Sequence, residues 1–265
     1  MSIADSLSDV QRRFLSRTAN FGQRWESGIA HSYQTLDLTH ATMLDGGAAH
    51  GLHTVNFAHF GGPTSRVIAV EANPDLIPGL EQLREKNNWR HVEIINVALA
   101  DAPGRREFYV APNVGHSSLM NHPHIAQVAR KIEVEARTID SIIDGGRLSF
   151  VKLDLEGGEY HAVLGARETI ARERPIFVME CAYGALLPRI GISSAEYFGF
   201  WQSFGYELID LSGIPLTEEM FNTPGLQGIL ANYLFAIPAG SADGLVMKSH
   251  IETSLAKATE RYPEK

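Results

Sequence analysis

The sequence predicts an α/β fold in which a mostly parallel sheet is covered by helices on both faces. Short apolar runs rich in Val, Ile and Leu alternate along the chain with segments of helical length. A glycine loop follows the first run, at Leu44–Gly51 with the sequence LDGGAAHG. An acid, Glu71, ends the second run, Arg66–Val70, twenty positions after Gly51. In such folds ligands bind at the carboxyl ends of the strands, so we expect the functional site there.

The elements expected before residue 105 follow from apolar runs and from the turn residues between them. The first strand ends at Asp45, and the glycine turn leads into a helix that begins near Leu52. The sequence NPD at 73–75 combines capping side chains with a proline, so a helix is expected over 76–86. The next apolar run, VEIINVAL at 92–99, is expected to form a third strand.

Residues 105–136 are predicted to form a hairpin-like excursion beside the main sheet. Apolar and polar residues alternate at 106–110 and again at 131–136, which is the pattern of half-buried strands. The segment 112–130 between them is rich in His, Asn and Ser and is expected to be a loop with some helix. We therefore treat the excursion as an insertion within one domain.

The second half of the chain returns to alternating strands and helices. The strands expected here cover residues 149–155, 175–180, 207–210 and 232–237. The turn at 156–159 leads into a helix through about residue 170. The sequence SSAE at 193–196 is typical of a capped helix start.

The two ends of the chain differ from its middle. Residues 1–40 are polar with scattered apolar positions, and we expect an N-terminal helical segment there. Residues 241–265 are also polar and are expected to form a C-terminal helical tail. The domain that carries the site is therefore expected over 41–240.

Composition and charge restrict the class of protein. The 265 residues are 44% hydrophobic and 20% charged, which is typical of a globular domain with a large core. The net charge of −8 argues against a nonspecific nucleic-acid binder. Cys181 is the only cysteine, which excludes an intrachain disulfide and a zinc site built from cysteines. Without a membrane-length apolar run or an apolar leader we expect a cytoplasmic protein, and a homo-oligomer is compatible with the sequence.

The glycine loop and Glu71 indicate a cofactor that contains adenosine. Glycines let backbone N–H groups approach a ligand, and Glu71 can accept hydrogen bonds from two ribose hydroxyls. The loop lacks the G-x-G-x-x-G spacing of dinucleotide sites, and the Asp45 carboxylate would repel a pyrophosphate. The same charge would attract the amino group and the sulfonium of S-adenosylmethionine. We favour this donor; the alternatives are a nicotinamide-dependent oxidoreductase and a tight structural turn capped by Asp45.

A second group of acids is expected at the same edge of the sheet. Asp154 and Glu156 lie two positions apart at the end of one strand, and Glu180 ends the next strand along the chain. These carboxylates could hold the methionine amino group or the substrate, act as general base, or share a divalent cation such as Mg²⁺. Lys152 is a candidate structural partner for Asp154, and Glu159 can stabilise a helix dipole.

Four blocks of sequence carry a family resemblance. They are LDGGAAHG at 44–51, VEANP at 70–74, NVALAD at 96–101 and KLDLEGGE at 152–159. Together they resemble the FkbM family of S-adenosylmethionine-dependent methyltransferases, over about residues 44 to 237. The resemblance implies a class I methyltransferase fold, which is Rossmann-like with seven strands, the last one antiparallel. It also implies methylation of a hydroxyl oxygen on a sugar, a polyketide or another natural product.

The resemblance also implies positions for the site residues. The cofactor would bind at Asp45, Gly46, Gly47, Gly51, Glu71, Ala72, Asn96, Val97, Ala98 and Asp154. Asp45 and the glycines would line the methionine end, Glu71 would hold the ribose, and residues 96–98 would lie near the adenine. Asp154 and Glu156 would face the reaction centre.

Methylation of a hydroxyl requires a base or a metal, because the alcohol must lose its proton. Asp154 or Glu156 is the first candidate for the base. His116 is a second candidate, in a loop that could close over the substrate. His122 and His124 are further metal candidates. The acceptor is expected to be a small molecule or a glycan, and a non-catalytic module that binds the cofactor is the remaining alternative.

Overall fold

The computed structural model describes residues 23–112, 116–120, 128–144, 147–181, 190–211, 213, 215–222 and 233–260. The chain divides into two compact units, which are residues 37–180 and the remainder on either side of that range. His122, His124 and residues 1–22 of the predicted N-terminal segment lie outside the described residues. The predicted division at residues 40 and 240 stays a prediction.

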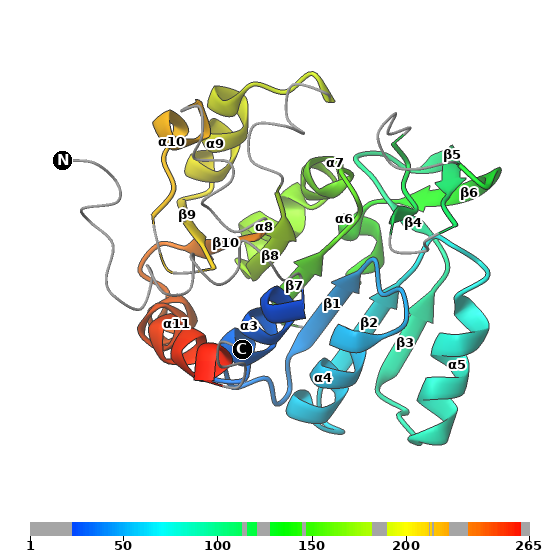
Figure 1. Cartoon of the computed structure of the whole chain (residues 1–265), viewed down its shortest axis with the longest axis horizontal. Coiled ribbons are helices and arrows are strands. Elements are labelled where there is room, and N and C mark those ends of the chain that lie inside the picture. Colours follow the sequence, from blue (N-terminus) through cyan, green and yellow to red (C-terminus); the bar gives the residue numbers. More distant parts are fainter. Residues whose placement is uncertain are drawn as a thin grey trace. The chain divides into compact units, whose positions relative to one another are not determined.

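The unit 37–180 is built on five parallel strands, which Figure 1 shows with their carboxyl ends directed toward a second, smaller sheet. The strands are β1 (Thr42–Gly46), β2 (Arg66–Val70), β3 (Val92–Ile95), β7 (Leu148–Leu153) and β8 (Ile176–Glu180), in the spatial order β3-β2-β1-β7-β8. The central strand, β1, is buried along its whole length and pairs with β2 on one side and β7 on the other. Asp45 lies opposite Lys152 in this register, which brings the first and fourth sequence blocks together.

The remaining unit contributes the helices α3 (Gln23–Tyr33), α9 (Ser194–Ser203), α10 (Glu218–Asn222) and α11 (Ala242–Glu260), together with the strands β9 (Tyr206–Asp210) and β10 (Tyr233–Pro238). β10 pairs with β9 in the antiparallel direction, and α3 packs against α11. The chain thus has a mostly parallel sheet of seven strands with helices, which confirms the predicted α/β fold class. No helix in the described part of the chain is long and apolar enough to cross a membrane.

Five helices belong to the unit 37–180. They are α4 (Leu52–Gly61), α5 (Ile77–Lys86), α6 (Ile139–Ile142), α7 (Glu159–Leu164) and α8 (Arg167–Glu173). Of these, α4 packs against β1 and β2, α5 against β3, α8 against β7, and α6 against α8. The single helix predicted over 159–170 is wrong, because the chain turns at Gly165 between α7 and α8. A Cβ on Gly165 would lie 2.2 Å from the carbonyl oxygen of Ala100, so only glycine allows this approach.

Of the two helix starts for which the sequence predicted a capping side chain, only α9 has one. Ser193 caps α9, since its Oγ accepts a hydrogen bond from the Glu196 N–H at 3.1 Å, as predicted. The N-cap residue of α5 is Leu76, which makes no side-chain capping bond. Asn73 instead stabilises the turn before that helix, because its Oδ1 accepts from the Asp75 N–H at 3.1 Å.

The excursion forms a separate three-stranded sheet of β4 (Ala98–Leu99), β5 (Gly104–Val110) and β6 (Arg130–Arg137), in the order β4-β6-β5. β5 and β6 are antiparallel, as the alternation of their residues predicted. Their inward side chains form a small core with Ala98, namely Phe108, Val110 and Val134. Figure 1 shows this sheet beyond the carboxyl ends of β1, β2 and β3, where the fold class puts the ligand site.

The third strand predicted over 92–99 is divided between the two sheets. Residues 92–95 pair with β2, whereas residues 98–99 pair with β6. The chain turns at Asn96, whose side-chain amide donates to the backbone oxygens of Glu71 at 2.8 Å and Ala72 at 3.2 Å. The Asn96 side chain therefore holds the backbone that follows β2. The predicted contact of Asn96 with adenine stays a prediction.

Candidate functional site

A pocket lies at the carboxyl ends of the parallel strands and is bordered by the small sheet. Its lining consists of Gly47, Ala49, Val70, Glu71, Ala72, Val97, Ala98, Leu99, Phe108, Ser117, Leu119, Asp154, Leu155, Glu156 and Gly158. The predicted cofactor residues in this lining are Gly47, Glu71, Ala72, Val97, Ala98 and Asp154, and the predicted catalytic residues in it are Asp154 and Glu156. The structure thus brings segments from all four sequence blocks to one pocket.

The glycine loop approaches the fourth block so closely that only glycine is accommodated. Gly47 has a φ of 73°, and a Cβ on it would lie 2.0 Å from the backbone oxygen of Asp154. The N–H groups of Gly47 and Ala48 both donate to the Val70 carbonyl oxygen, at 2.9 and 3.0 Å. The Ala49 N–H donates to Glu71. These three amides are bound to protein acceptors and do not form the open cradle that a pyrophosphate requires.

Glu71 ends β2 with a buried carboxylate that is held by the backbone. Its Oε2 accepts from the Ala49 N–H at 2.9 Å and its Oε1 from the Asn73 N–H at 2.7 Å. Burial raises the pKa of Glu71, and these two hydrogen bonds oppose the shift. Each carboxylate oxygen can accept a further hydrogen bond, so Glu71 can fix the loop and still receive ribose hydroxyls from the pocket.

Asp45 is fully buried and is not among the residues that line the pocket. Its Oδ2 accepts from the Thr54 hydroxyl at 2.6 Å, and its Oδ1 lies 3.7 Å from the ammonium nitrogen of Lys152. That nitrogen also lies 3.6 Å from Asp154 Oδ2 and donates to the Gly47 oxygen at 3.1 Å. Asp45 is therefore a partner of a buried lysine, not a helix cap, and its direct contact with the cofactor stays a prediction.

Three other predicted site residues, Gly46, Gly51 and His116, lie outside the pocket lining. Gly46 belongs to β1, and Gly51 is the N-cap residue of α4 with a left-handed φ of 83°. His116 is half-exposed, and its Nδ1 lies 3.7 Å from Glu156 Oε1, so the structure brings His116 to the edge of the acid cluster.

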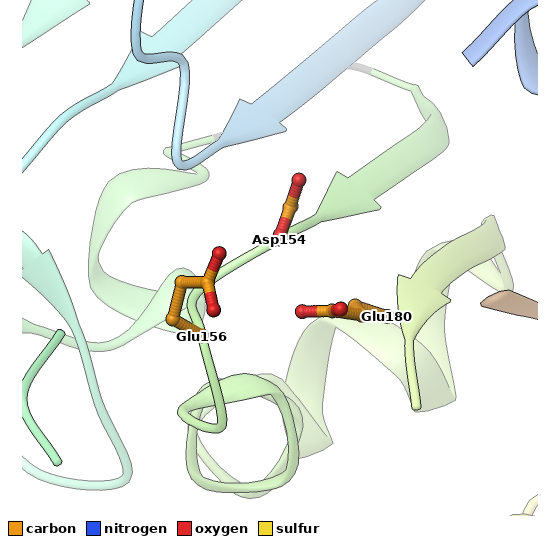
Figure 2. A group of neighbouring side chains, drawn as sticks. All are labelled: Asp154, Glu156 and Glu180. Atoms are coloured by element: carbon orange, nitrogen blue, oxygen red, sulfur yellow. The ribbon is translucent and has the colours of Figure 1, made fainter. Parts of the chain in front are cut away.

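The predicted acids converge at one point, as Figure 2 shows for Asp154, Glu156 and Glu180. One oxygen from each of the three carboxylates lies within 4.8 Å of the others. Burial, together with the charges of Asp154 and Glu159, raises the pKa of Glu156 to about 8. Burial and the same neighbouring acids also raise the pKa of Glu180. The cluster therefore retains protons near neutral pH and can both donate and accept hydrogen bonds.

Sequence reasoning missed the wall of the pocket that the excursion provides. Phe108, Ser117 and Leu119 line the pocket from β5 and the segment that follows it. The alternation of β5 gave a signal for Phe108, because it places this side chain on the same face as Val110. Ser117 and Leu119 lie in an irregular segment, where no periodic pattern indicates which side chains face inward.

Comparison with known proteins now identifies the family. A family model described as the methyltransferase FkbM domain matches residues 45–208. The chain belongs to the FkbM family of methyltransferases. The match includes the glycine loop, Glu71 and the acid cluster of this FkbM protein. No functionally curated protein matches it.

Solved structures of methyltransferases resemble the FkbM protein at low sequence identity. Methyltransferase FkbM from Methylobacillus flagellatus is 18% identical with a TM-score of 0.49, and the match covers 76% of this chain and 44% of that one. Aeropyrum pernix fibrillarin with natively bound S-adenosyl-L-methionine is 13% identical, with a TM-score of 0.44 and coverages of 80% and 76%. An SAH-bound methyltransferase from Podospora anserina is 10% identical, with a TM-score of 0.42 and coverages of 87% and 88%. The present chain therefore matches less than half of the length of the Methylobacillus protein.

Proposed function

We propose that the protein transfers a methyl group from S-adenosylmethionine to a hydroxyl oxygen of a small-molecule or glycan acceptor. The observation that carries this proposal is one pocket whose lining combines two kinds of acidic group. Glu71 offers acceptors for ribose hydroxyls, and Asp154 and Glu156 belong to the cluster of acids that can accept a proton. Because the glycine-loop amides already have protein acceptors, the pocket suits a cationic donor better than a pyrophosphate.

In this proposal the adenosine binds against Glu71, Ala72, Val97 and Ala98, and the methionine end extends toward Asp154. The acceptor oxygen attacks the methyl carbon, the carbon–sulfur bond breaks, and S-adenosylhomocysteine leaves as a neutral thioether. The chain contributes mainly by holding the two reactants in line. The hydroxyl proton passes to a carboxylate of the acid cluster.

Asp154 and Glu156 are the proposed bases because both line the pocket. The raised pKa of Glu156 makes its carboxylate a stronger proton acceptor once it is ionised. His116 is the alternative base, because its Nδ1 lies 3.7 Å from Glu156 Oε1 at the edge of the acid cluster. The two cases differ in pH dependence, since a Glu156 base predicts a rate that rises as pH passes about 8.

The acid cluster is also suited to a divalent cation such as Mg²⁺, which prefers carboxylate oxygens. Asp154, Glu156 and Glu180 would hold the ion, and their mutual proximity supports this second proposal. A bound cation would supply Lewis-acid activation of the hydroxyl. Treatment with a chelator should then abolish turnover, and added Mg²⁺ should restore it; turnover that survives chelation would leave the carboxylates acting alone.

Calorimetric titration with S-adenosylhomocysteine and, separately, with NAD tests the donor. We expect binding of the former and no heat with the latter; the reverse result would indicate an oxidoreductase. Methyl-labelled S-adenosylmethionine incubated with a panel of sugars and hydroxylated natural products tests the reaction. Binding without label transfer to any acceptor in the panel or in cell extract would indicate a non-catalytic binding module.

A further inference from the structure

The loop that connects β7 to α7 has an unusual backbone conformation at its acidic residue. Glu156 has a φ of 53°, in the left-handed region that non-glycine residues rarely adopt, and Gly157 follows with a φ of 98°. A left-handed residue costs roughly 1–2 kcal/mol, so neighbouring groups must hold it in place. Two buried side chains outside the predicted site form hydrogen bonds with this loop, one with its carbonyl oxygens and one with its N–H groups.

The first of these side chains is Ser118, in the segment that follows β5. Its hydroxyl lies 2.8 Å from the Glu156 carbonyl oxygen and 3.3 Å from that of Leu155. The Ser118 Oγ also accepts a hydrogen bond from the Met120 N–H at 2.9 Å. Ser118 is only 1% exposed, and its backbone forms two hydrogen bonds with Tyr109 of β5. The serine therefore connects the small sheet to the carbonyl groups of the loop.

The second side chain is Glu159, in the first turn of α7. Its Oε1 accepts from the Leu155 N–H at 2.6 Å and, at 3.4 Å, from the Gly157 N–H. The carboxylate is buried, and its two hydrogen bonds with the loop give it a structural role beyond the helix dipole that the sequence indicated. Leu155 is consequently held through both its N–H group and its carbonyl oxygen, by Glu159 and Ser118 respectively.

We infer that Ser118 and Glu159 are positioning residues, which hold the loop so that the Glu156 carboxylate faces the pocket. This inference rests on the proposed methyl transfer only for its consequence, which is a loss of turnover when the loop is released. The small sheet therefore contributes to the geometry of the reaction centre, because Ser118 forms a hydrogen-bonded link between β5 and the loop. A displaced carboxylate would no longer lie in reach of the acceptor hydroxyl.

The test compares the variants Ser118→Ala, Glu159→Ala and Glu159→Gln with the wild-type protein. Glutamine retains a side-chain oxygen that can accept the same two N–H groups, so it should rescue a positioning residue. Ser65→Ala is the matched control. Ser65 is also a buried serine whose hydroxyl donates to a backbone carbonyl, that of Gly62 at 2.8 Å, but it lies at the amino end of β2.

Hydrogen–deuterium exchange of a peptide that covers Leu155–Gly157 reports on the loop itself. We expect exchange to accelerate about tenfold in Glu159→Ala and severalfold in Ser118→Ala, with wild-type rates in Glu159→Gln and Ser65→Ala. With the acceptor found in the panel above, kcat should fall between about ten- and a hundredfold in the two faster-exchanging variants. Affinity for S-adenosylhomocysteine should change less than about twofold, because the contacts of Glu71 remain.

Wild-type exchange and turnover in both alanine variants would overturn the inference. It would also be overturned if Glu159→Gln lost as much activity as Glu159→Ala, since the charge would then matter and not the acceptor geometry. Should Glu159→Ala fail to fold, Ser118→Ala alone decides the question. If the wild-type protein neither binds S-adenosylhomocysteine nor transfers methyl groups, the proposed function fails, and the exchange rates still decide whether the two residues hold the loop.

Discussion

Two groups of carboxylates near the carboxyl ends of the strands have different surroundings. In the first group, which we call the glycine-loop end, Glu71 accepts two backbone N–H groups, and Asp45 accepts the Thr54 hydroxyl and faces an ammonium group. At the other end, Asp154, Glu156 and Glu180 face one another within 4.8 Å. Both groups of acids end parallel strands of the same sheet, so the difference lies in their local contacts and not in the fold.

This difference separates binding from reaction in physical terms. Carboxylates that accept backbone donors are fixed before a ligand arrives, which lowers the entropy cost of binding it. Carboxylates that face one another repel, and this raises their affinity for a proton or a cation. The first end therefore suits recognition of a constant adenosine group, and the second suits proton transfer. Lys152 touches both ends, because its ammonium group lies between Asp45 and Asp154.

The largest effect is expected from removing Lys152, which both groups of acids share. We expect Lys152→Met to lower the free energy of unfolding by about 3–5 kcal/mol, since it leaves the fully buried Asp45 charge without its cationic partner. Urea unfolding monitored by circular dichroism measures the loss. Lys131→Met is the control, because Lys131 is an exposed lysine 3.5 Å from the exposed Glu107, and it should cost less than about 1 kcal/mol. Equal costs for the two variants would contradict the buried link.

Exchanging one acid at the reactive end should separate turnover from binding. We expect Asp154→Asn to lower kcat by about a hundredfold or more, because an amide can neither accept the hydroxyl proton nor stabilise positive charge. The affinity for S-adenosylhomocysteine, measured by calorimetry, should stay within a few-fold of wild type. Unchanged turnover would remove Asp154 from the chemistry and leave Glu156 or His116 as the base.

The opposite result is expected at the glycine-loop end. Glu71→Gln should weaken binding of S-adenosylhomocysteine by about tenfold, because one carboxylate oxygen becomes an N–H₂ group that cannot accept a ribose hydroxyl. Glu93→Gln on β3 is the control, since Glu93 is a partly exposed residue paired with Arg66. If Glu71→Gln lowered kcat and left the affinity intact, the assignment of the two ends would be reversed.

The fold could be predicted because its strands are continuous apolar runs with turn residues between them. The hairpin of β5 and β6 also followed from local alternation. The division of residues 92–99 between two sheets could not be predicted, because it depends on the Asn96 side chain reaching the end of a strand 25 residues earlier. The break at Gly165 likewise depends on a distant backbone oxygen, that of Ala100.

The site was predicted in composition better than in geometry. The strand ends indicated that Asp154, Glu156 and Glu180 would meet, and they do. For Asp45, sequence position suggested a charge exposed to the cofactor, yet a buried lysine from a strand 107 residues later neutralises it. Contacts between residues so far apart in the chain leave no local pattern in the sequence. The argument for a cationic donor consequently depends on the glycine-loop amides, which already have protein acceptors and leave no cradle for a pyrophosphate, and not on Asp45.

The last expected effect concerns the dependence of stability on pH. Burial raises the pKa of Glu156 to about 8 and that of Glu159 to about 7, from an ordinary value of 4.5. The folded state then binds these protons more tightly than the unfolded state does. Their contribution to stability is therefore complete below about pH 4.5 and is lost as pH rises through 7 and 8.

Urea midpoints measured across this pH range should accordingly fall toward the alkaline end in the wild-type protein. Glu156→Gln should flatten the upper part of the decline, because an amide has no proton to lose. Glu93→Gln, at a partly exposed position on β3, should leave the profile unchanged. If the urea midpoint of Glu156→Gln fell with pH as steeply as that of the wild type, Glu156 would not be the group that loses a proton over this range. The contrast with the glycine-loop end would then depend on Glu180, whose carboxylate faces the same point.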